Sequence, residues 1–297
     1  MKRIWKGMGT TLLLLAFLAF LLYFVFVPGY FLNRKAVALP ENEREEMIVM
    51  SANVRCFAPT DVMHKSWFYR ARLLREDIEL VSPDVIGFQE VTGVHYDYLV
   101  NILPDYDSTI CYRDNSPLSE GCPIFYCTDK YDKVDGGTFW LSETPDEMSK
   151  SWGSSHYRIA TYLILKDKTT AKEFVVFNTH LDHKSQEARI EGIRLVVDKI
   201  REFGDIPAIL MGDLNATPSS ETISSTKVDF DDAYDVATIS DEGATYHNYG
   251  KEPDRERIDY ILLSKGKFSV SEYRIVDNGR SGQYSSDHAP IYVKMKF

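Results

Sequence analysis

The stretch Ala208–Asn215 reads AILMGDLN: four apolar residues run directly into a glycine, a carboxylate and an amide. A short apolar run of this kind predicts a buried strand. Similar junctions between an apolar run and polar side chains occur at four other places, namely Gln89-Glu90, Asn178-Thr179-His180, Arg257-Ile258-Asp259 and Ser286-Asp287-His288. Because strand ends in open α/β sheets gather on common edges, we expect these five junctions to form one site.

Apolar runs and helical spacing predict an α/β domain with extensive sheet. Most of the expected strands are apolar on both faces, as strands covered on two sides are. Helices are expected over 67–80, ending before Pro83, and over 185–203, capped by Ser185 and closed by Gly204. The predicted strands cover residues 47–53, 84–88, 122–127, 159–165, 174–177, 208–211, 258–263 and 291–297.

The amino-terminal residues predict a membrane segment. Every residue from Leu12 to Val27 is apolar or aromatic, and a helix over 10–28 is long enough to cross about 30 Å of hydrocarbon. Basic residues at positions 2, 3 and 6 precede this segment. They predict that residues 1–9 form a short cytoplasmic tail and that the chain after the segment lies outside the cytoplasm. A cleaved signal peptide, with 36–38 as the site, is the alternative and would give a secreted protein.

Composition indicates one globular domain after this segment. Residues 29–46 are expected to form a stalk, and 47–297 the catalytic domain. The chain of 297 residues is 44% hydrophobic and carries a net charge of −10, which disfavours disorder and nonspecific binding to polyanions. Its four cysteines leave two alternatives open: a disulfide from Cys111 to Cys122 or Cys127, or buried thiols. No oligomerisation signal or protein partner is predicted.

Three kinds of side chain at the strand ends suit metal-assisted phosphoryl transfer. Carboxylates are hard oxygen ligands that favour Mg²⁺, or Mn²⁺ as a substitute, over zinc. Amides donate hydrogen bonds to a phosphate without repelling it. Imidazoles titrate near neutrality, so they can remove a proton from water or bind an anionic transition state. The candidates are Glu90, Asp213 and Asp287, then Asn53 and Asn215, then His180 and His288.

The order of these motifs along the chain resembles that of the endonuclease/exonuclease/phosphatase superfamily, with its deoxyribonuclease I-like fold. The resemblance covers nearly all of 47–297. It implies an α/β four-layer sandwich of two mixed β-sheets flanked by helices, with the site at one end of the sandwich. Residues 137–145 and 158–161 look like those of exported bacterial members whose substrate is usually unassigned.

The resemblance also implies roles for the candidate residues. Glu90 looks like the principal Mg²⁺ ligand, Asn53 like a neighbouring metal residue on the first strand, and Asp287 like an additional ligand. Asp213 and Asn215 look like the pair that orients the attacking water or leaving group and binds phosphate. His180 looks like a histidine that contacts the phosphate. His288 looks like the histidine that is held by a carboxylate, here Asp259, and acts as a general base or phosphate ligand.

Two further residues are predicted to bind substrate: Arg158, at the start of a strand, and His247, in a glycine-flanked loop. His64, His95 and His156 are taken as structural or exposed. The predicted function is a Mg²⁺-dependent phosphodiesterase that hydrolyses a phospholipid headgroup or a small extracellular phosphodiester. There are two alternatives. One is an exported nonspecific nuclease, for which nucleic acid would be a substrate and not a stable partner. The other is a catalytically inactive binding module.

Overall fold

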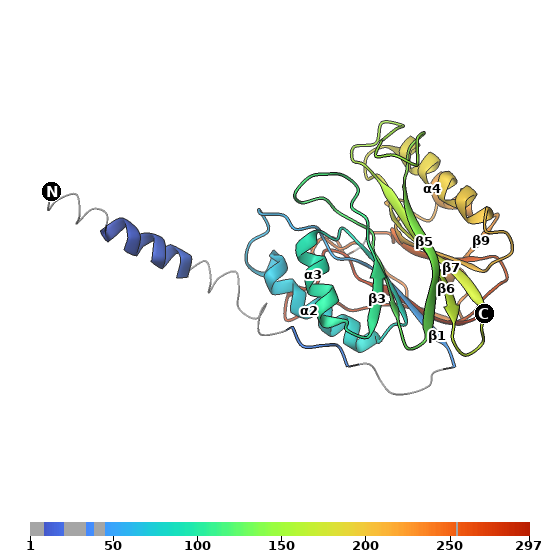
Figure 1. Ribbon diagram of the computed structural model, residues 1–297, viewed down its shortest axis with the longest axis horizontal. Helices are drawn as coiled ribbons and strands as arrows, with labels where there is room; N and C mark the ends of the chain where they lie inside the picture. The colour runs from blue at the N-terminus through green and yellow to red at the C-terminus, as the bar shows by residue number, and fades with distance from the viewer. Residues whose placement is uncertain (1–8, 21–33, 39–44, 254) are drawn as a thin grey trace.

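The structure, a computed structural model, describes residues 9–20, 34–38, 45–253 and 255–297 (Figure 1). Its main feature is a pair of mixed β-sheets. The first sheet has the order β10-β12-β15-β1-β2-β4-β3 and the second the order β5-β6-β7-β8-β11-β9. The strands of the first are β1 (Met47–Asn53), β2 (Val85–Gln89), β3 (Tyr106–Thr109), β4 (Ile124–Cys127), β10 (Ile239–Ser240), β12 (Ser269–Ile275) and β15 (Ile291–Lys296). Those of the second are β5 (Tyr131–Trp140), β6 (Ile159–Asp167), β7 (Glu173–His180), β8 (Ala208–Asp213), β9 (Phe230–Asp232) and β11 (Asp259–Ser264).

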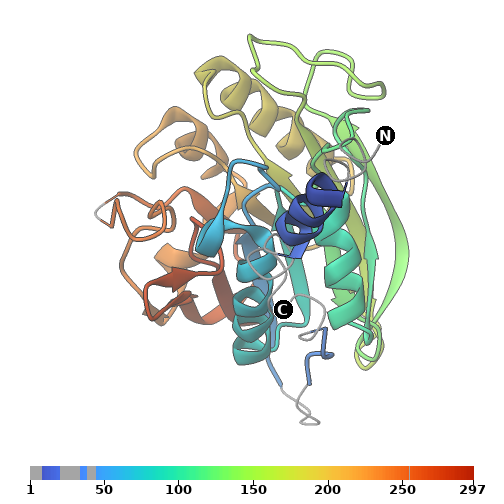
Figure 2. The same cartoon turned by 90° about the vertical axis from the view of Figure 1, so that its left-hand side faces the viewer.

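Helices cover the outer faces of the two sheets. The two longest on the first sheet, α2 (Trp67–Val81) and α3 (Gly93–Ile102), lie side by side in both views (Figures 1 and 2). On the second sheet α4 (Gln186–Arg201) packs beside α5 (Glu221–Thr226). Shorter elements complete the described fold: the 3₁₀ turn η1 (Met63–Lys65), α6 (Ala233–Val236) and a small hairpin of β13 (Gly279–Arg280) and β14 (Gln283–Tyr284).

Three apolar clusters separate these layers, and β1 shows how the sequence builds them. Successive side chains of a strand point to opposite faces. Val49 accordingly packs in the cluster between the two sheets, whereas Ile48 and Met50 pack in the cluster against α2 and α3. A third cluster lies between the second sheet and α4. The layers form the predicted α/β sandwich of two mixed sheets flanked by helices.

Strand directions bring the polar strand ends together. β1 is parallel to β2, and β7 is parallel to β8. The two sheets meet at this end, because the Asn53 side chain at the end of β1 lies 3.0 Å from Asp213 at the end of β8. β11 runs antiparallel to β8, so its first residue, Asp259, lies opposite Asp213. All five predicted junctions therefore reach one end of the sandwich.

Gly212 permits the close approach of β7 and β8 at this end. Its φ is +147°, and a Cβ there would lie 1.9 Å from the Thr179 carbonyl oxygen. We predict that Gly212→Ala lowers the free energy of unfolding by at least about 3 kcal/mol, because the main chain of two buried strands must move. Gly204→Ala is the matched control: its φ is +68° but no atom lies within 4 Å of the added Cβ. Thermal melts that fall equally for both variants would contradict this account.

The amino-terminal segment is described only in part. Residues 9–20 form an exposed helix. None of the helices within the described residues is long and apolar enough to cross a membrane. The remainder of the predicted 10–28 segment, most of the 1–9 tail and parts of the 29–46 stalk fall outside the described residues.

Residues 34–38 of the predicted stalk pack against the domain. Val37 is buried, and its N–H donates a 2.8 Å hydrogen bond to the Ile102 carbonyl at the end of α3. Arg34 forms a 3.0 Å ion pair with Asp97 on the same helix. This part of the segment is therefore attached to the folded domain. The four cysteines are free thiols; Cys122 and Cys127 are buried, whereas Cys56 and Cys111 are only partly buried.

Candidate metal and phosphate site

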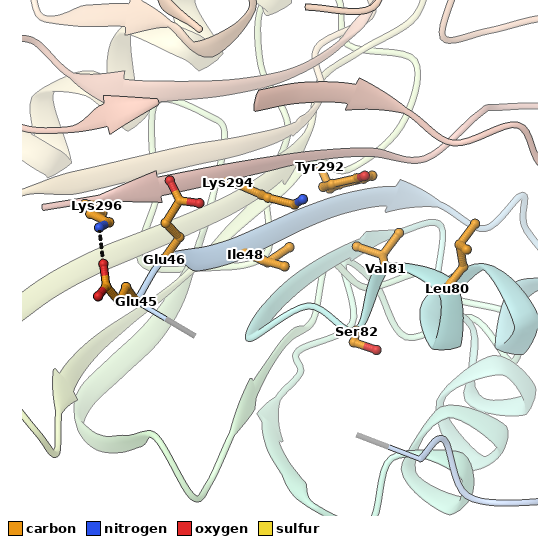
Figure 3. A pocket seen from close by; sticks show the side chains of 9 residues that line it. All are labelled: Glu45, Glu46, Ile48, Leu80, Val81, Ser82, Tyr292, Lys294 and Lys296. Carbon is orange, nitrogen blue, oxygen red and sulfur yellow. Dashed lines mark hydrogen bonds and ion pairs between the residues drawn. The ribbon is translucent and has the colours of Figure 1, made fainter. Parts of the chain in front are cut away.

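A cavity of about 570 Å³ lies where the strand ends meet. Of the predicted site residues, Glu90, Arg158, His180, Asp213, Asn215, Asp287 and His288 line it. A second cavity, of about 490 Å³, lies at the opposite end of β1, beside the end of α2 (Figure 3). There Lys296 pairs with Glu45 at 2.8 Å, and no cluster of potential metal ligands is found among the described residues that line it. The potential metal ligands lie at the first cavity.

Two overlapping groups of side chains at this cavity could hold a metal ion. One comprises Glu90, His180 and Asp213, and the other Asp213, Asp259 and His288; within each group the potential ligand atoms lie within 4.8 Å of one another. Asp213 belongs to both. Three carboxylates crowded into a buried site repel one another, and a divalent cation offsets that repulsion. The oxygen donors of Glu90 and Asp213 suit a hard divalent cation.

Glu90 is held with both carboxylate oxygens engaged. Its backbone has a φ of +62°, a conformation that a non-glycine residue adopts at a cost and that here directs the side chain into the cavity. The Asn53 amide donates to Oε1 at 3.0 Å, and the Cys56 N–H donates to Oε2 at 2.6 Å. Burial alone would raise the pKa of Glu90, but these hydrogen bonds and the charge of His288 lower it below its usual range. The carboxylate is therefore ionised and ready to bind a cation.

Asn53 lies between two carboxylates. Its amide nitrogen donates to Glu90 and also to Asp213, each at 3.0 Å, while its oxygen accepts the Arg55 N–H at 2.8 Å. The amide oxygen, which is the atom that could bind a metal, is thus turned toward the main chain. In this arrangement Asn53 positions the carboxylates of Glu90 and Asp213.

Asp213 differs from Glu90 in its protonation. Burial and the neighbouring charge of Asp259 raise the pKa of Asp213 to about 7. The Asn215 N–H donates to Asp213 Oδ1 at 2.9 Å, and the Asn215 side-chain amide donates to the Leu181 carbonyl at 3.1 Å. A carboxylate that titrates near neutrality is suited to accept a proton from water.

The two site histidines differ in protonation. Burial would lower the pKa of His288, but Asp259, 2.9 Å from Nδ1, and Asp213, 3.7 Å from Nε2, raise it to about 10. His288 is therefore an imidazolium at neutral pH. Burial and the charges of Arg158 and Arg113 hold the pKa of His180 well below its usual value. His180 is neutral, with Nε2 3.4 Å from Asp213.

Arg158 is a buried cation with few partners. It is 5% exposed, and its Nε has no hydrogen-bond partner. The nearest groups are Asp182, whose Oδ2 lies 3.9 Å from Nε, and His183, whose Nδ1 lies 3.4 Å from Nη2. Burial and the charge of Arg113 lower the pKa of Arg158. Because Arg158 lines the cavity, its guanidinium provides a positive charge for an anionic group bound there.

Two predicted residues are placed differently from the rest. Asp287 lines the cavity, but it lies outside both potential metal groups, and its carboxylate faces Arg55 at 3.9 Å. His247 does not line the cavity: its Nε2 lies 3.1 Å from Asn278 Oδ1 and its ring contacts Tyr284. The adjacent Tyr246 faces the site instead, because it pairs with His288 in an isolated β-bridge and neighbouring side chains alternate.

Several residues that line the cavity were not identified from the sequence. Arg113 and Glu120 form a bidentate ion pair, with contacts of 2.7 and 2.8 Å, on the connection between β3 and β4. His156, which the sequence analysis takes as structural or exposed, also lines the cavity and stacks on His183 with ring centroids 5.5 Å apart. His183 could have been found from its position three residues after His180. The remaining ones are Arg55, Cys56, Tyr246, Arg255 and Ile258.

The chain is similar to proteins of one family over most of its length. A model described as the Endonuclease/Exonuclease/phosphatase family matches residues 50–288. A Bacteroides vulgatus structure named as an endonuclease/exonuclease/phosphatase is 32% identical, with a TM-score of 0.81, and covers 86% of this chain and 100% of that one. A Bacteroides thetaiotaomicron structure named as a mannosyl-6-phosphatase is 31% identical, with a TM-score of 0.78, and covers 84% and 100%.

Curated relatives match over shorter parts of their length. Nocturnin of Drosophila melanogaster is 29% identical over 180 residues, which make up 56% of this chain and 26% of that protein. Human nocturnin is 23% identical over 271 residues, 81% of this chain and 61% of that protein. The chain thus spans less than two thirds of each of these two relatives.

Proposed function

This chain belongs to the endonuclease/exonuclease/phosphatase family and is a metal-dependent phosphoesterase, and we propose that it hydrolyses a phosphate ester of a small polyol. One observation carries the proposal. Two carboxylates that can hold a metal, Glu90 and Asp213, line a single cavity together with the charged His288 and the buried guanidinium of Arg158. Together these groups can bind a phosphate ester and stabilise the charge that develops when water attacks the ester bond.

Size and similarity favour a small polyol as the alcohol part of the ester. The volume of about 570 Å³ lies in the range of small-molecule sites. The relative named as a mannosyl-6-phosphatase is 31% identical to this chain, so a sugar phosphate is one form of the proposed substrate. The other form is the phosphodiester expected from the sequence, such as a phospholipid headgroup. Where the phosphodiester carries a polyol such as glycerol, both forms present a phosphate on a hydroxyl-rich alcohol.

We propose Mg²⁺ as the physiological ion, with Mn²⁺ able to replace it. Glu90 would hold it as the ionised carboxylate of low pKa, with Asn53 fixing the orientation. A cation there would neutralise phosphate oxygens and stabilise the leaving oxygen. Asp287, which also lines the cavity, would bind the ion only if its carboxylate turned away from Arg55.

The remaining residues have separate tasks in the proposed reaction. Asp213, with its pKa near 7, would accept a proton from the attacking water, which Asn215 helps to orient. His288, held by Asp259, would donate a hydrogen bond from Nε2 to a phosphate oxygen. His180, being neutral, would contact the phosphate without adding charge. Separation of the two carboxylate pKa values, low for Glu90 and high for Asp213, supports this division of roles.

We also propose that the catalytic domain, 47–297, is outside the cytoplasm and is held at a membrane by the 10–28 segment. The continuous apolar run from Leu12 to Val27 and the basic residues before it support this location. Protease accessibility of the full chain in spheroplasts tests it. Digestion of the domain with the membrane intact is expected, and protection of the domain until lysis would contradict it.

A substrate panel tests the proposed activity. Purified full-length protein is assayed with Mg²⁺ or EDTA on mannose 6-phosphate, glycerophosphodiesters, bis-p-nitrophenyl phosphate, phospholipid vesicles, plasmid DNA and RNA. We expect metal-dependent release of phosphate or alcohol from the polyol esters. Hydrolysis of the nucleic acids alone would favour the exported nuclease. Silence on all substrates by a protein that binds Mg²⁺ would favour the inactive binding module.

Arg158→Met is expected to lower kcat/KM about tenfold to a hundredfold. Methionine keeps an apolar stem of similar size, but it removes a charged hydrogen-bond donor, a contact of about 1.5–3 kcal/mol. Arg194→Met, on the exposed surface of α4, is the matched control. Unchanged kcat/KM for every cleaved ester would show that Arg158 does not bind the substrate.

A further inference from the structure

Thr245, in the loop before β11, has a buried hydroxyl that accepts two main-chain hydrogen bonds. The residue is 0% exposed. Its Oγ1 accepts the N–H of Ile258 at 2.9 Å and the N–H of Asp259 at 3.1 Å. The hydroxyl therefore fixes the main chain at the residue whose carboxylate holds His288.

The carbonyl of the same residue fixes the other member of this pair. It accepts the N–H of Ala289, the residue after His288, at 2.7 Å. The next residue, Tyr246, forms a β-bridge with His288, and the two rings lie edge to face with centroids 4.9 Å apart. One residue thus links the two separate chain segments that carry Asp259 and His288.

The spacing of the pair depends on this link. The Nδ1 of His288 lies 2.9 Å from the Asp259 carboxylate, and both side chains are buried. If Thr245 lost its hydroxyl, the buried N–H of Asp259 and the partly buried N–H of Ile258 would lose their acceptor, and a buried donor without a partner is unfavourable. A shift of the Asp259 main chain toward a new acceptor would relieve that cost. It would also lengthen the contact that keeps His288 oriented toward the cavity.

We propose that Thr245 is a positioning residue for the Asp259–His288 pair, acting through its two oxygens rather than by contact with substrate. It does not appear among the residues that line the cavity. In metal sites, groups that hold a ligand from behind contribute about 10–100-fold to affinity or activity, and we expect an effect of that order for Thr245. The expected effect on kcat rests on the proposed function. The effect of Thr245 on the geometry of the Asp259–His288 pair does not.

The kinetic test uses three variants of the full-length protein. At saturating Mg²⁺, Thr245→Val is expected to lower kcat for the best ester about 10–100-fold with KM within about threefold, and Thr245→Ser to restore kcat to within about threefold. Thr226→Val is the matched control, because it removes a buried hydroxyl that bonds within α5, away from the site. Equal loss in Thr245→Val and Thr245→Ser would contradict the role of the hydroxyl.

A double-mutant cycle separates positioning from a general effect on the fold. In an Asp259→Asn background, Thr245→Val is expected to cause little further loss of kcat, because the pair it positions is already broken. The same fold-loss in both backgrounds would overturn the proposal.

A spectroscopic measurement keeps the proposal testable without a known substrate or a stable valine variant. The proton between His288 Nδ1 and Asp259 is expected to give a low-field NMR resonance that Asp259→Asn abolishes. Thr245→Val, or Thr245→Ala if valine prevents folding, is expected to shift or broaden this resonance, and Thr245→Ser to retain it. A resonance unchanged in a folded valine or alanine variant would refute the proposal, whatever the enzyme's activity.

Discussion

Replacing Glu90 by glutamine is expected to lower turnover by about three orders of magnitude and leave the fold intact. Glutamine has nearly the same shape, but it replaces an ionised oxygen ligand with a neutral amide. The Asn53 amide and the Cys56 N–H both donate to this side chain, so the amide nitrogen of glutamine would face a donor. Loss of several kcal/mol of metal-derived stabilisation corresponds to a rate loss of this size.

Metal affinity and stability are measured with the same variant. Binding of Mn²⁺ should weaken strongly. The thermal midpoint should fall only modestly, because relief of the repulsion between Glu90 and Asp213 partly offsets the loss of the favourable contacts of the Glu90 carboxylate. Glu79→Gln, at a partly exposed ion pair on α2, is the matched control and should match the wild type in every assay. Wild-type activity in Glu90→Gln would remove Glu90 from the metal site.

Replacing His288 by alanine is expected to abolish most activity, by about a thousandfold, even when metal is saturating. The imidazolium is the group whose charge and N–H can meet a phosphate oxygen, and preorganised donors of this kind contribute about a hundredfold to a thousandfold or more. The change also leaves Asp259 buried without its partner, so the thermal midpoint should fall.

A second substitution separates these two effects. His288→Asn keeps a donor near the position of Nδ1 and so keeps Asp259 paired, but it has no group at the position of Nε2. It should be as inactive as His288→Ala while melting closer to the wild type. His64→Ala, at an exposed position in η1, serves as control. If excess metal restored activity to His288→Ala, the residue would act as a metal ligand and the proposed role would be wrong.

The sequence predicts those strands whose burial produces an unbroken apolar run. β1 was predicted with its observed bounds, because all of its residues are buried. β5 was missed because it is an edge strand paired only to β6, with exposed charges and two glycines in YDKVDGGTFW. α3 was missed because its capping box uses Thr92 and His95, where the usual partner is glutamate or glutamine.

For the site too, residues in a clear local sequence pattern could be predicted and residues outside one could not. Residues at the strand ends could be predicted because short motifs mark each junction, and the strand directions then bring them together. Arg113 and Glu120 could not, because they reach the cavity from an irregular connection with no periodic pattern. His247 could not be placed either. It points away from the cavity because Tyr246 pairs with His288, and this pairing joins segments that are distant in the sequence. The orientation of the Asn53 amide likewise depends on its hydrogen bonds to Glu90, Asp213 and the main chain of Arg55.

The most direct test of a metal-dependent phosphoesterase centred on Glu90 is a metal titration. Mg²⁺ is added to EDTA-treated full-length protein, and ester hydrolysis and metal binding are followed together for the wild type and Glu90→Gln. We predict no turnover before metal is added, a saturable rise that follows the binding curve in the wild type, and a weak, strongly shifted response in the variant. Equal turnover in EDTA, or coincident curves for the two proteins, would contradict the assignment.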